Sequence, residues 1–139
     1  IRCEKMLPDG GKALKRLADT PKQPSRNYRM LIESSRIMGM YDGREAMEQV
    51  IYKILNTERY RYVVYSWNYG IELMDLFGMP ADYVCPVLEK RISEALLQDD
   101  RIMEVKDFVF DISRKGAVYA EFTVVTDVGE IEAGKEVAI

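Results

Sequence analysis

DGREAMEQVIYKILN, residues 42–56, holds the clearest helix start in the sequence. Asp42 is a residue type that caps the free amides of a helix N-terminus, and Glu45, three residues later, can reach back as in a capping box. Apolar residues then recur at steps of three and four: Ala46, Met47, Val50, Ile51, Ile54 and Leu55. This spacing predicts an amphipathic helix from about Gly43 to Asn56 whose apolar stripe lies in the core.

Before this helix, the sequence favours two short strands at residues 28–33 and 36–41. Residues 1–27 are interpreted as an arm in which turn signals and prolines surround a short helix at residues 12–18. The arm is either a segment that a partner orders or a frayed terminus. Residues 28–139 are expected to form a single domain.

After the helix, residues 60–67 are rich in aromatic residues and valine, a composition that favours an extended segment. Residues 70–77 predict a short helix closed by Gly78. A third helix is predicted over about residues 82–98, in which Pro86 is tolerable only within the first turn. Its expected buried stripe consists of Val84, Leu88, Ile92, Ala95 and Leu96.

The last third of the chain changes to a period of two, which is typical of strands. Two alternating sets flank a turn at residues 114–116 and predict a β-hairpin with one wetter face: Phe108, Phe110 and Ile112, then Val118, Ala120, Phe122 and Val124. A third strand is expected after Gly129, extending past Gly134 to Ile139. The predicted fold class is α+β, with two short N-terminal strands, two to three helices, and C-terminal antiparallel strands packed on the helices.

The composition limits the chemistry of the chain. Its 139 residues suit one globular domain, and a net charge of −3 does not favour nucleic-acid binding. Without histidine, no Ser-His-Asp triad, Cys-His pair or His-containing zinc site can be built from these residues. The cysteines Cys3 and Cys85 are interpreted as free thiols. No apolar run approaches the roughly 20 residues of a membrane helix and no secretory signal is visible, so assembly in the cytoplasm is expected.

Two constellations are candidates for chemistry. Asp99 and Asp100 could bind a metal ion or share a proton, but adjacent residues rarely point at one ion, and Arg101 offers a partner for one of the acids. The string ERYRY at residues 58–62 could stack on single-stranded bases, although a strand with alternating faces explains it more simply. No residue is therefore assigned a catalytic, cofactor-binding or metal-binding role, and the chain is not expected to be an enzyme.

Four blocks of the sequence, in this order and spacing, carry a family resemblance: DGREAMEQVIYKILNTERY at 42–60, YSWNYGIEL at 65–73, RISEALLQDDRI at 91–102 and FTVVTDVGEI at 122–131. Together they resemble the small baseplate wedge protein of contractile phage tails, in the PBSX-type form of defective Gram-positive prophages. This family is also called the sheath initiator and carries an older lysozyme-like label. The resemblance covers about residues 28–139.

Two steps of the family pattern can be placed in this sequence. The family has an aromatic-Gly step that opens a short helix, which here is Tyr69-Gly70. It often has a Glu-Pro-Arg step after the long helix, where this chain reads Asp99-Asp100-Arg101 and lacks the proline. Only a structural role is carried over for these residues and for Asp42 and Glu45.

The resemblance implies a structural subunit of a tail baseplate that links wedge subunits and starts the sheath through its C-terminal strand. An edge strand offers unpaired N–H and C=O groups to another chain, and Glu130, Glu132, Lys135 and Glu136 would blunt that edge by charge. The expected protein-binding residues are Gly129, Glu130, Ile131, Glu132, Ala133, Val137 and Ile139. The alternative for this segment is an edge strand that pairs only with the hairpin.

The expected partners are the other baseplate wedge proteins and the tail sheath protein, with no nucleic acid, membrane, cofactor or small-molecule substrate. The expected location is the bacterial cytoplasm during assembly and then the baseplate of a virion or phage-tail-like particle. Two other functions stay open from the sequence. One is a regulatory protein-binding module, because a bacterial anti-adaptor resembles the same fold, and the other is a cell-wall hydrolase.

Overall fold

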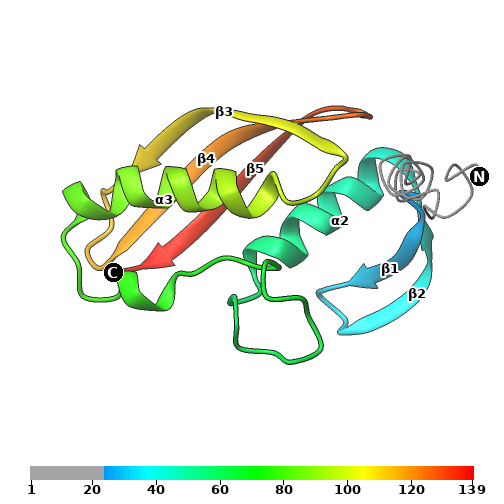
Figure 1. Ribbon diagram of the computed structural model, residues 1–139, viewed down its shortest axis with the longest axis horizontal. Helices are drawn as coiled ribbons and strands as arrows, with labels where there is room; N and C mark the ends of the chain where they lie inside the picture. Colours follow the sequence, from blue (N-terminus) through cyan, green and yellow to red (C-terminus); the bar gives the residue numbers. More distant parts are fainter. Residues whose placement is uncertain (1–23) are drawn as a thin grey trace, which may run out of the picture.

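The computed structural model describes residues 24–139, in which two strands are followed by two α-helices and then by three strands (Figure 1). The predicted α+β class is confirmed. The arm predicted for residues 1–27 and its helix at 12–18 fall mainly outside the described residues, although Asn27 already opens a strand. The elements are β1 (Asn27–Leu31), β2 (Arg36–Tyr41), α2 (Gly43–Leu55), the 3₁₀ helix η2 (Met74–Leu76), α3 (Ala81–Leu96), β3 (Ile102–Asp111), β4 (Ala117–Thr126) and β5 (Gly129–Ala138).

Two layers build the core. The strands β3, β4 and β5 form an antiparallel sheet with β4 in the middle, α3 crosses one face, and α2 packs against β5 and α3 (Figure 1). Along β4, buried residues alternate with partly or fully exposed ones, as expected when one face is covered and the other is open. The predicted inward set of β4 is confirmed as buried: Val118, Ala120, Phe122 and Val124.

Helix α2 forms because its apolar stripe has a sheet and a helix to cover it. All six predicted stripe residues are buried. The capping box is not built: Asp42 Oδ1 accepts from the adjacent Gly43 N at 2.8 Å, and within residues 24–139 neither hydrogen bond between Asp42 and Glu45 is made. Gly43 has a φ of +60°, so the chain leaves the helical path at its first residue and the reciprocal geometry is not built.

Helix α3 buries its full predicted stripe but starts one residue earlier than expected. Pro86 therefore lies in the second turn, so the expectation that it must fall in the first was wrong. The proline removes the N–H that would bond to the carbonyl of Asp82. Pro86 and Asp82 are both exposed, so that carbonyl lies on the solvent side, and the buried stripe opposite holds the helix together.

The segment after α2 differs most from the sequence-based expectation. Residues 60–67 form turns instead of an extended strand, and Val63, Val64 and Trp67 are exposed. The helix predicted at residues 70–77 is reduced to η2, and Tyr69-Gly70 does not open it. A strand needs a partner along its length, and within the described part of the chain one parallel bridge, Glu58 with Ile71, closes the base of the loop.

The β1–β2 hairpin is attached to α2 by one side chain. Gln49 is only 7% exposed; its Nε2 donates to Tyr28 O at 2.6 Å, and its Oε1 accepts from Met30 N at 2.8 Å. The amide therefore bonds to β1 as another strand would, at the place where the β1–β2 register shifts. A two-stranded sheet is marginal by itself, so this contact fixes the hairpin on the domain.

Candidate assembly surface

Strand β5 lies at one edge of the C-terminal sheet and is also part of its core. It pairs with β4 from Gly129, opposite Thr126, to Ala138, opposite Ala117, without a break in register. Ile131 and Val137 are 2% and 4% exposed and pack into the core. The strand is therefore fixed on one side, while its other side borders no strand among residues 24–139.

The register determines which backbone groups of β5 face outward. Ile139 N donates to Gly116 O at 2.9 Å, one step beyond the last strand pair. Because bonded residues alternate along an antiparallel pair, the odd-numbered residues of β5 bond to β4. The N–H and C=O groups that point to the free edge belong to Glu130, Glu132, Gly134, Glu136 and Ala138, and no other backbone group from residue 24 onward bonds to them.

The opposite edge of the sheet is built differently. The pairing of β3 with β4 shifts register twice, between Ile102 and Glu104 and again between Lys106 and Val109. Asp107, inside the second shift, has a φ of +56°. Bulges of this kind twist an edge away from an incoming strand, whereas β5 stays regular over its whole length. Of the two edges, β5 is the one suited to pair with another chain.

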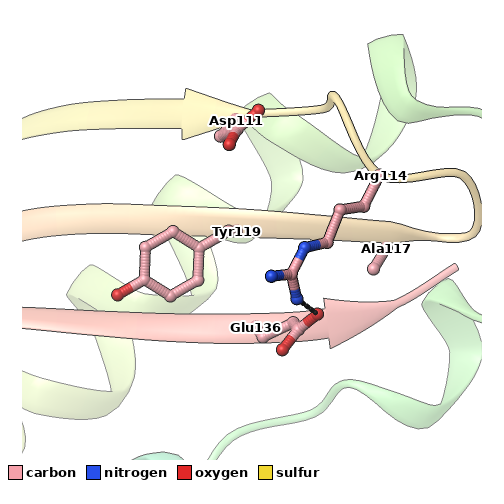
Figure 2. Close-up of a pocket in the computed structure, with 5 residues that line it drawn as sticks. All are labelled: Asp111, Arg114, Ala117, Tyr119 and Glu136. Atoms are coloured by element: carbon pink, nitrogen blue, oxygen red, sulfur yellow. Dashed lines mark hydrogen bonds and ion pairs between the residues drawn. The ribbon is translucent and has the colours of Figure 1, made fainter.

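The open face of the sheet is acidic beside β5, and most of these charges are paired. Lys106 Nζ lies 2.6 Å from Glu130 Oε1, and Arg114 Nη1 lies 3.3 Å from Glu136 Oε1 (Figure 2). Both pairs join β5 to β3 or to the turn after it, across β4. Glu132 lies between them and is exposed, and within the described chain its carboxylate has no ion pair or hydrogen bond.

On the covered side, a groove of about 230 Å³ runs between β5 and the C-terminal half of α2. Tyr52 and Asn56 contribute from the helix, and Ala133 contributes from the strand. Next to the groove, Lys135 Nζ donates to Asn56 Oδ1 at 2.8 Å. Burial lowers the pKa of Lys135, and the nearby Glu58 acts in the opposite direction. An inward-pointing lysine is one way in which edge strands avoid unwanted pairing.

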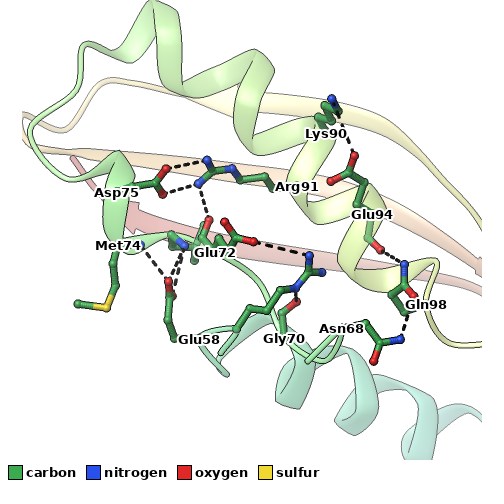
Figure 3. A network of polar contacts seen from close by, with 12 residues as sticks. Glu58, Asn68, Gly70, Glu72, Met74, Asp75, Lys90, Arg91, Glu94 and Gln98 are labelled. Carbon is green, nitrogen blue, oxygen red and sulfur yellow. Dashed lines mark hydrogen bonds and ion pairs between the residues drawn. The ribbon is translucent and has the colours of Figure 1, made fainter. Parts of the chain in front are cut away.

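A polar network closes the loop of residues 59–70 (Figure 3). Glu58 Oε1 accepts from Leu73 N at 3.1 Å and Met74 N at 3.2 Å, so it holds the start of η2. From α3, Arg91 donates to Glu72 O at 2.8 Å and to both carboxylate oxygens of Asp75. The hydrogen bonds from Arg91 are the main cause of the lowered pKa of Asp75.

The structure brings Tyr69 and Asp99 to one side of this loop. The Tyr69 ring stacks on Tyr65 at 4.6 Å between centroids, and burial raises its pKa, with smaller effects from Tyr65 and Asp99. The neighbouring Gly70 has a φ of +92°, and a Cβ there would clash with the Thr57 carbonyl oxygen. Gly70 therefore allows the two ends of the loop to meet.

Asp99 and Arg101 form a bidentate ion pair after α3. Arg101 Nε and Nη2 lie 2.8 Å and 2.6 Å from the two Asp99 oxygens, and Arg101 N also donates to Asp99 Oδ1. Burial raises the pKa of Asp99, but these hydrogen bonds outweigh it, so the pKa is lowered. Arg101 O accepts from Asp127 N at 3.1 Å, which joins this turn to the β4–β5 hairpin. Asp100 is exposed beside the pair.

The other sequence expectations can also be placed. Within residues 24–139, no group of three or more metal-binding side chains comes together, and none of the helices described is long and apolar enough to cross a membrane. Cys85 is half-buried in α3, where burial raises its pKa, while Cys3 lies outside the described residues.

The groove residues Tyr52 and Asn56 were not predicted from the sequence, although Tyr52 directly follows Ile51 of the buried stripe.

Comparison with known proteins gives two matches. A sequence profile for the family described as contractile injection system sheath initiator matches residues 25–129. The phage-like element PBSX protein XkdS of Bacillus subtilis (strain 168) is 38% identical over 115 residues, covering 79% of this chain and 80% of that protein. The matches confirm the resemblance drawn from the four sequence blocks. The profile match ends at Gly129, where β5 begins, so support for a role of β5 comes from its geometry.

Proposed function

The chain belongs to the contractile injection system sheath initiator family. We propose that it starts the sheath by pairing β5 with a strand of the first sheath subunits. Membership of this family makes it a structural component of a contractile phage-type tail that contacts the sheath and other tail proteins. The proposal adds how the sheath contact is made. It also includes a link to baseplate wedge subunits, with assembly in the cytoplasm before the protein joins the tail.

The observation that carries the proposal is the regular free edge of β5. Five residues of this strand direct N–H and C=O groups outward to which no backbone group of residues 24–139 bonds, while the edge of β3 is interrupted by bulges. Adding a strand to such an edge gives affinity through main-chain hydrogen bonds. It needs no reactive side chain, so the proposed role is structural and not catalytic.

The three carboxyl groups with a shifted pKa favour this role over a hydrolase. A glycosidase needs an acid whose pKa is raised, so that it holds a proton at neutral pH. Where the pKa of a carboxyl group is shifted in residues 24–139, at Asp75, Asp99 and Asp111, it is lowered. Arg91, Arg101 and Ser113 are the respective hydrogen-bond donors, so these acids serve to hold the fold.

The test substitutes Gly134, whose N–H points to the free edge. Gly134→Pro removes that N–H and keeps the bonds to β4, because the odd-numbered residues make them. Gly134→Ala is the matched control: it adds the same Cβ beside Tyr119 but keeps the N–H. Deleting β5 would be a poor test, because Ile131 and Val137 are buried and their loss would unfold the core.

Each variant is co-expressed with the sheath protein of the same tail and examined by size-exclusion chromatography, with folding checked by circular dichroism. The proposal predicts that the alanine variant elutes with the sheath protein and that the proline variant, although folded, does not. Equal co-elution of both folded variants would rule out pairing at this edge. The proposed link to baseplate wedge subunits is tested in a separate co-elution experiment. Wedge proteins are expected to bind both variants.

A further inference from the structure

We propose that the sheath strand that pairs with β5 has alternating side chains, with a basic residue opposite Glu132 and an apolar residue in the groove between β5 and α2. This inference rests on the proposed function and specifies the chemistry of its partner. A strand added to a sheet continues the alternation of the strand that it joins, so its side chains divide between the open face and the covered face.

On the open face, one of the three glutamates of β5 is left for a cation of the incoming strand. Glu130 and Glu136 are already paired with Lys106 and Arg114, while Glu132 between them has no cation among the described residues. Directly opposed residues in neighbouring strands lie close enough for opposite charges to attract. A lysine or arginine opposite Glu132 would neutralise it, and an acidic residue there would be repelled.

On the covered face, the groove selects a different side chain. Its floor includes Ile51, Leu55 and Ile131, each at most 3% exposed, and its rim includes Tyr52 and Ala133. Glu48 at the mouth is already paired with Arg44 at 3.1 Å, and Lys135 beside the groove already donates to Asn56 at 2.8 Å. Among residues 24–139, Glu132 is therefore the one charged group of the groove that has no partner. A branched aliphatic side chain would gain burial there, whereas a charged one would lose its water without gaining a partner.

The groove is continuous with the outward backbone groups. The residues that line it include Glu132 and Gly134, whose N–H and C=O groups point to the free edge. An incoming strand bonded to those groups would therefore pass along the groove, with one side chain directed into it and its neighbours directed to the acidic face. The same contact would set the register, because a shift by one residue would exchange the two faces.

The experiment measures binding of the sheath protein to the immobilised full-length chain by biolayer interferometry, at low and at high salt. Glu132→Lys is expected to weaken binding about tenfold at low salt, and the loss should shrink at high salt because salt screens exposed charges. Glu132→Gln is the neutral control and is expected to show a smaller loss. A Lys→Glu or Arg→Glu substitution at the facing position of the sheath strand should restore binding to the Glu132→Lys chain.

The groove is tested with Tyr52, which is 42% exposed and can be changed without disturbing the core. Tyr52→Glu is expected to weaken binding about tenfold at both salt concentrations, because it places a charge where an apolar side chain is to be buried. Tyr52→Phe is the control that keeps the apolar wall, and it should bind as the wild type does.

The outcomes separate the two proposals. If Gly134→Pro abolishes binding while Glu132→Lys and Tyr52→Glu bind as the wild type does, the sheath pairs with β5 but the inferred side-chain pattern is wrong. If Gly134→Pro and Gly134→Ala bind equally, the edge pairing itself is wrong, and the inference fails with it. Both proposals are supported if all three test variants lose binding, Gly134→Ala and Tyr52→Phe retain it, and Glu132→Gln shows the smaller loss.

Discussion

On the open face of the sheet, the Tyr119 ring lies over Gly134 of the neighbouring strand. The two residues are diagonal neighbours, since Tyr119 pairs with Glu136 and Gly134 pairs with Glu121. A Cβ built on Gly134 would lie 2.8 Å from Tyr119 Cζ and closer still to the hydroxyl oxygen. The ring therefore fills the space that a side chain at residue 134 would occupy, and it covers a glycine that would otherwise weaken an edge strand.

This contact predicts that the effect of Gly134→Ala on stability has opposite signs with and without the Tyr119 ring. Gly134→Ala should destabilise the wild-type chain, because the new Cβ displaces the Tyr119 ring. In a Tyr119→Ala chain the same substitution should stabilise by about 0.5–1 kcal/mol, the usual advantage of Ala over Gly inside a strand. Free energies of unfolding of the four chains in urea form a double-mutant cycle. Additive effects would mean that the two side chains do not compete for space.

The loop closure at Gly70 gives a second prediction. Gly78, with a φ of +82° and no atom within 4 Å of a built Cβ, is its matched control. Gly78→Ala should cost about 1–2 kcal/mol of stability for the left-handed conformation alone. Gly70→Ala should cost about 1–3 kcal/mol more, because the Cβ also disrupts the 2.9 Å hydrogen bond from Ile71 N to Thr57 O.

Urea unfolding of both glycine variants measures these costs. Equal losses at the two positions would show that the approach of Thr57 to Gly70 adds nothing. A specific loss at Gly70 would also explain why an aromatic-Gly step stands here without opening a helix. Gly70, which lies four residues before η2 begins, would then serve to bring the chain back beside Glu58.

Gln49 provides a third prediction, which concerns only the β1–β2 hairpin. Gln49→Met keeps the length of the side chain but leaves Tyr28 O and Met30 N without their partner. We expect a loss of about 1–3 kcal/mol, with faster hydrogen exchange confined to β1 and β2. Glu45→Met, at an exposed residue one turn earlier on the same side of the helix, is the control. Unchanged exchange in the hairpin of the Gln49→Met chain would contradict this attachment.

The Asp99–Arg101 pair predicts a pH dependence. The pKa of Asp99 is lower in the folded chain than in the unfolded one, so its contribution to stability is complete above the unfolded value of about 3.9. It is lost as the pH falls through the lower, folded value. Asp99→Asn should therefore reduce stability by about 1–3 kcal/mol near neutral pH, and the difference from wild type should close below about pH 4.

Urea unfolding of both chains at several pH values tests this prediction. Asp75 and Asp111 also have lowered pKa values, but they are present in both chains, so the difference between the two curves isolates Asp99. A difference that stays constant down to the acid end of the range would mean that the ion pair does not depend on ionisation of Asp99.

The parts of the fold that could be predicted are those in which spacing alone decides burial. The stripes of α2 and α3 and the alternation of β4 each have one covered face, and the sequence periodicity follows that face. Residues 60–67 were predicted wrongly because aromatic residues and valine favour strands only where a partner strand is available. The partner of Glu58 is Ile71, on the far side of the loop, and no local pattern indicates it.

For the candidate assembly surface, the sequence predicts which segment forms the edge strand but not which of its backbone groups are free. The sequence marks residues 129–139 as a strand, and it cannot indicate which backbone groups point outward, because that depends on the register with β4. It also cannot place Tyr52 and Asn56 beside β5, since that contact depends on how α2 packs against the sheet. The bulges of β3, which distinguish the two edges, depend on a positive φ at Asp107 that its residue type alone does not require.

The most direct test of strand pairing at β5 is amide hydrogen exchange, resolved by residue with NMR, for the full chain with and without the sheath protein. In the free chain, the odd-numbered amides from Ile131 to Val137 should be protected by β4, and the even-numbered amides from Glu130 to Ala138 should exchange rapidly. If the sheath pairs with β5, bound sheath protein should protect the even-numbered amides and remove the alternation. If the complex forms and those amides still exchange rapidly, the sheath does not pair with β5.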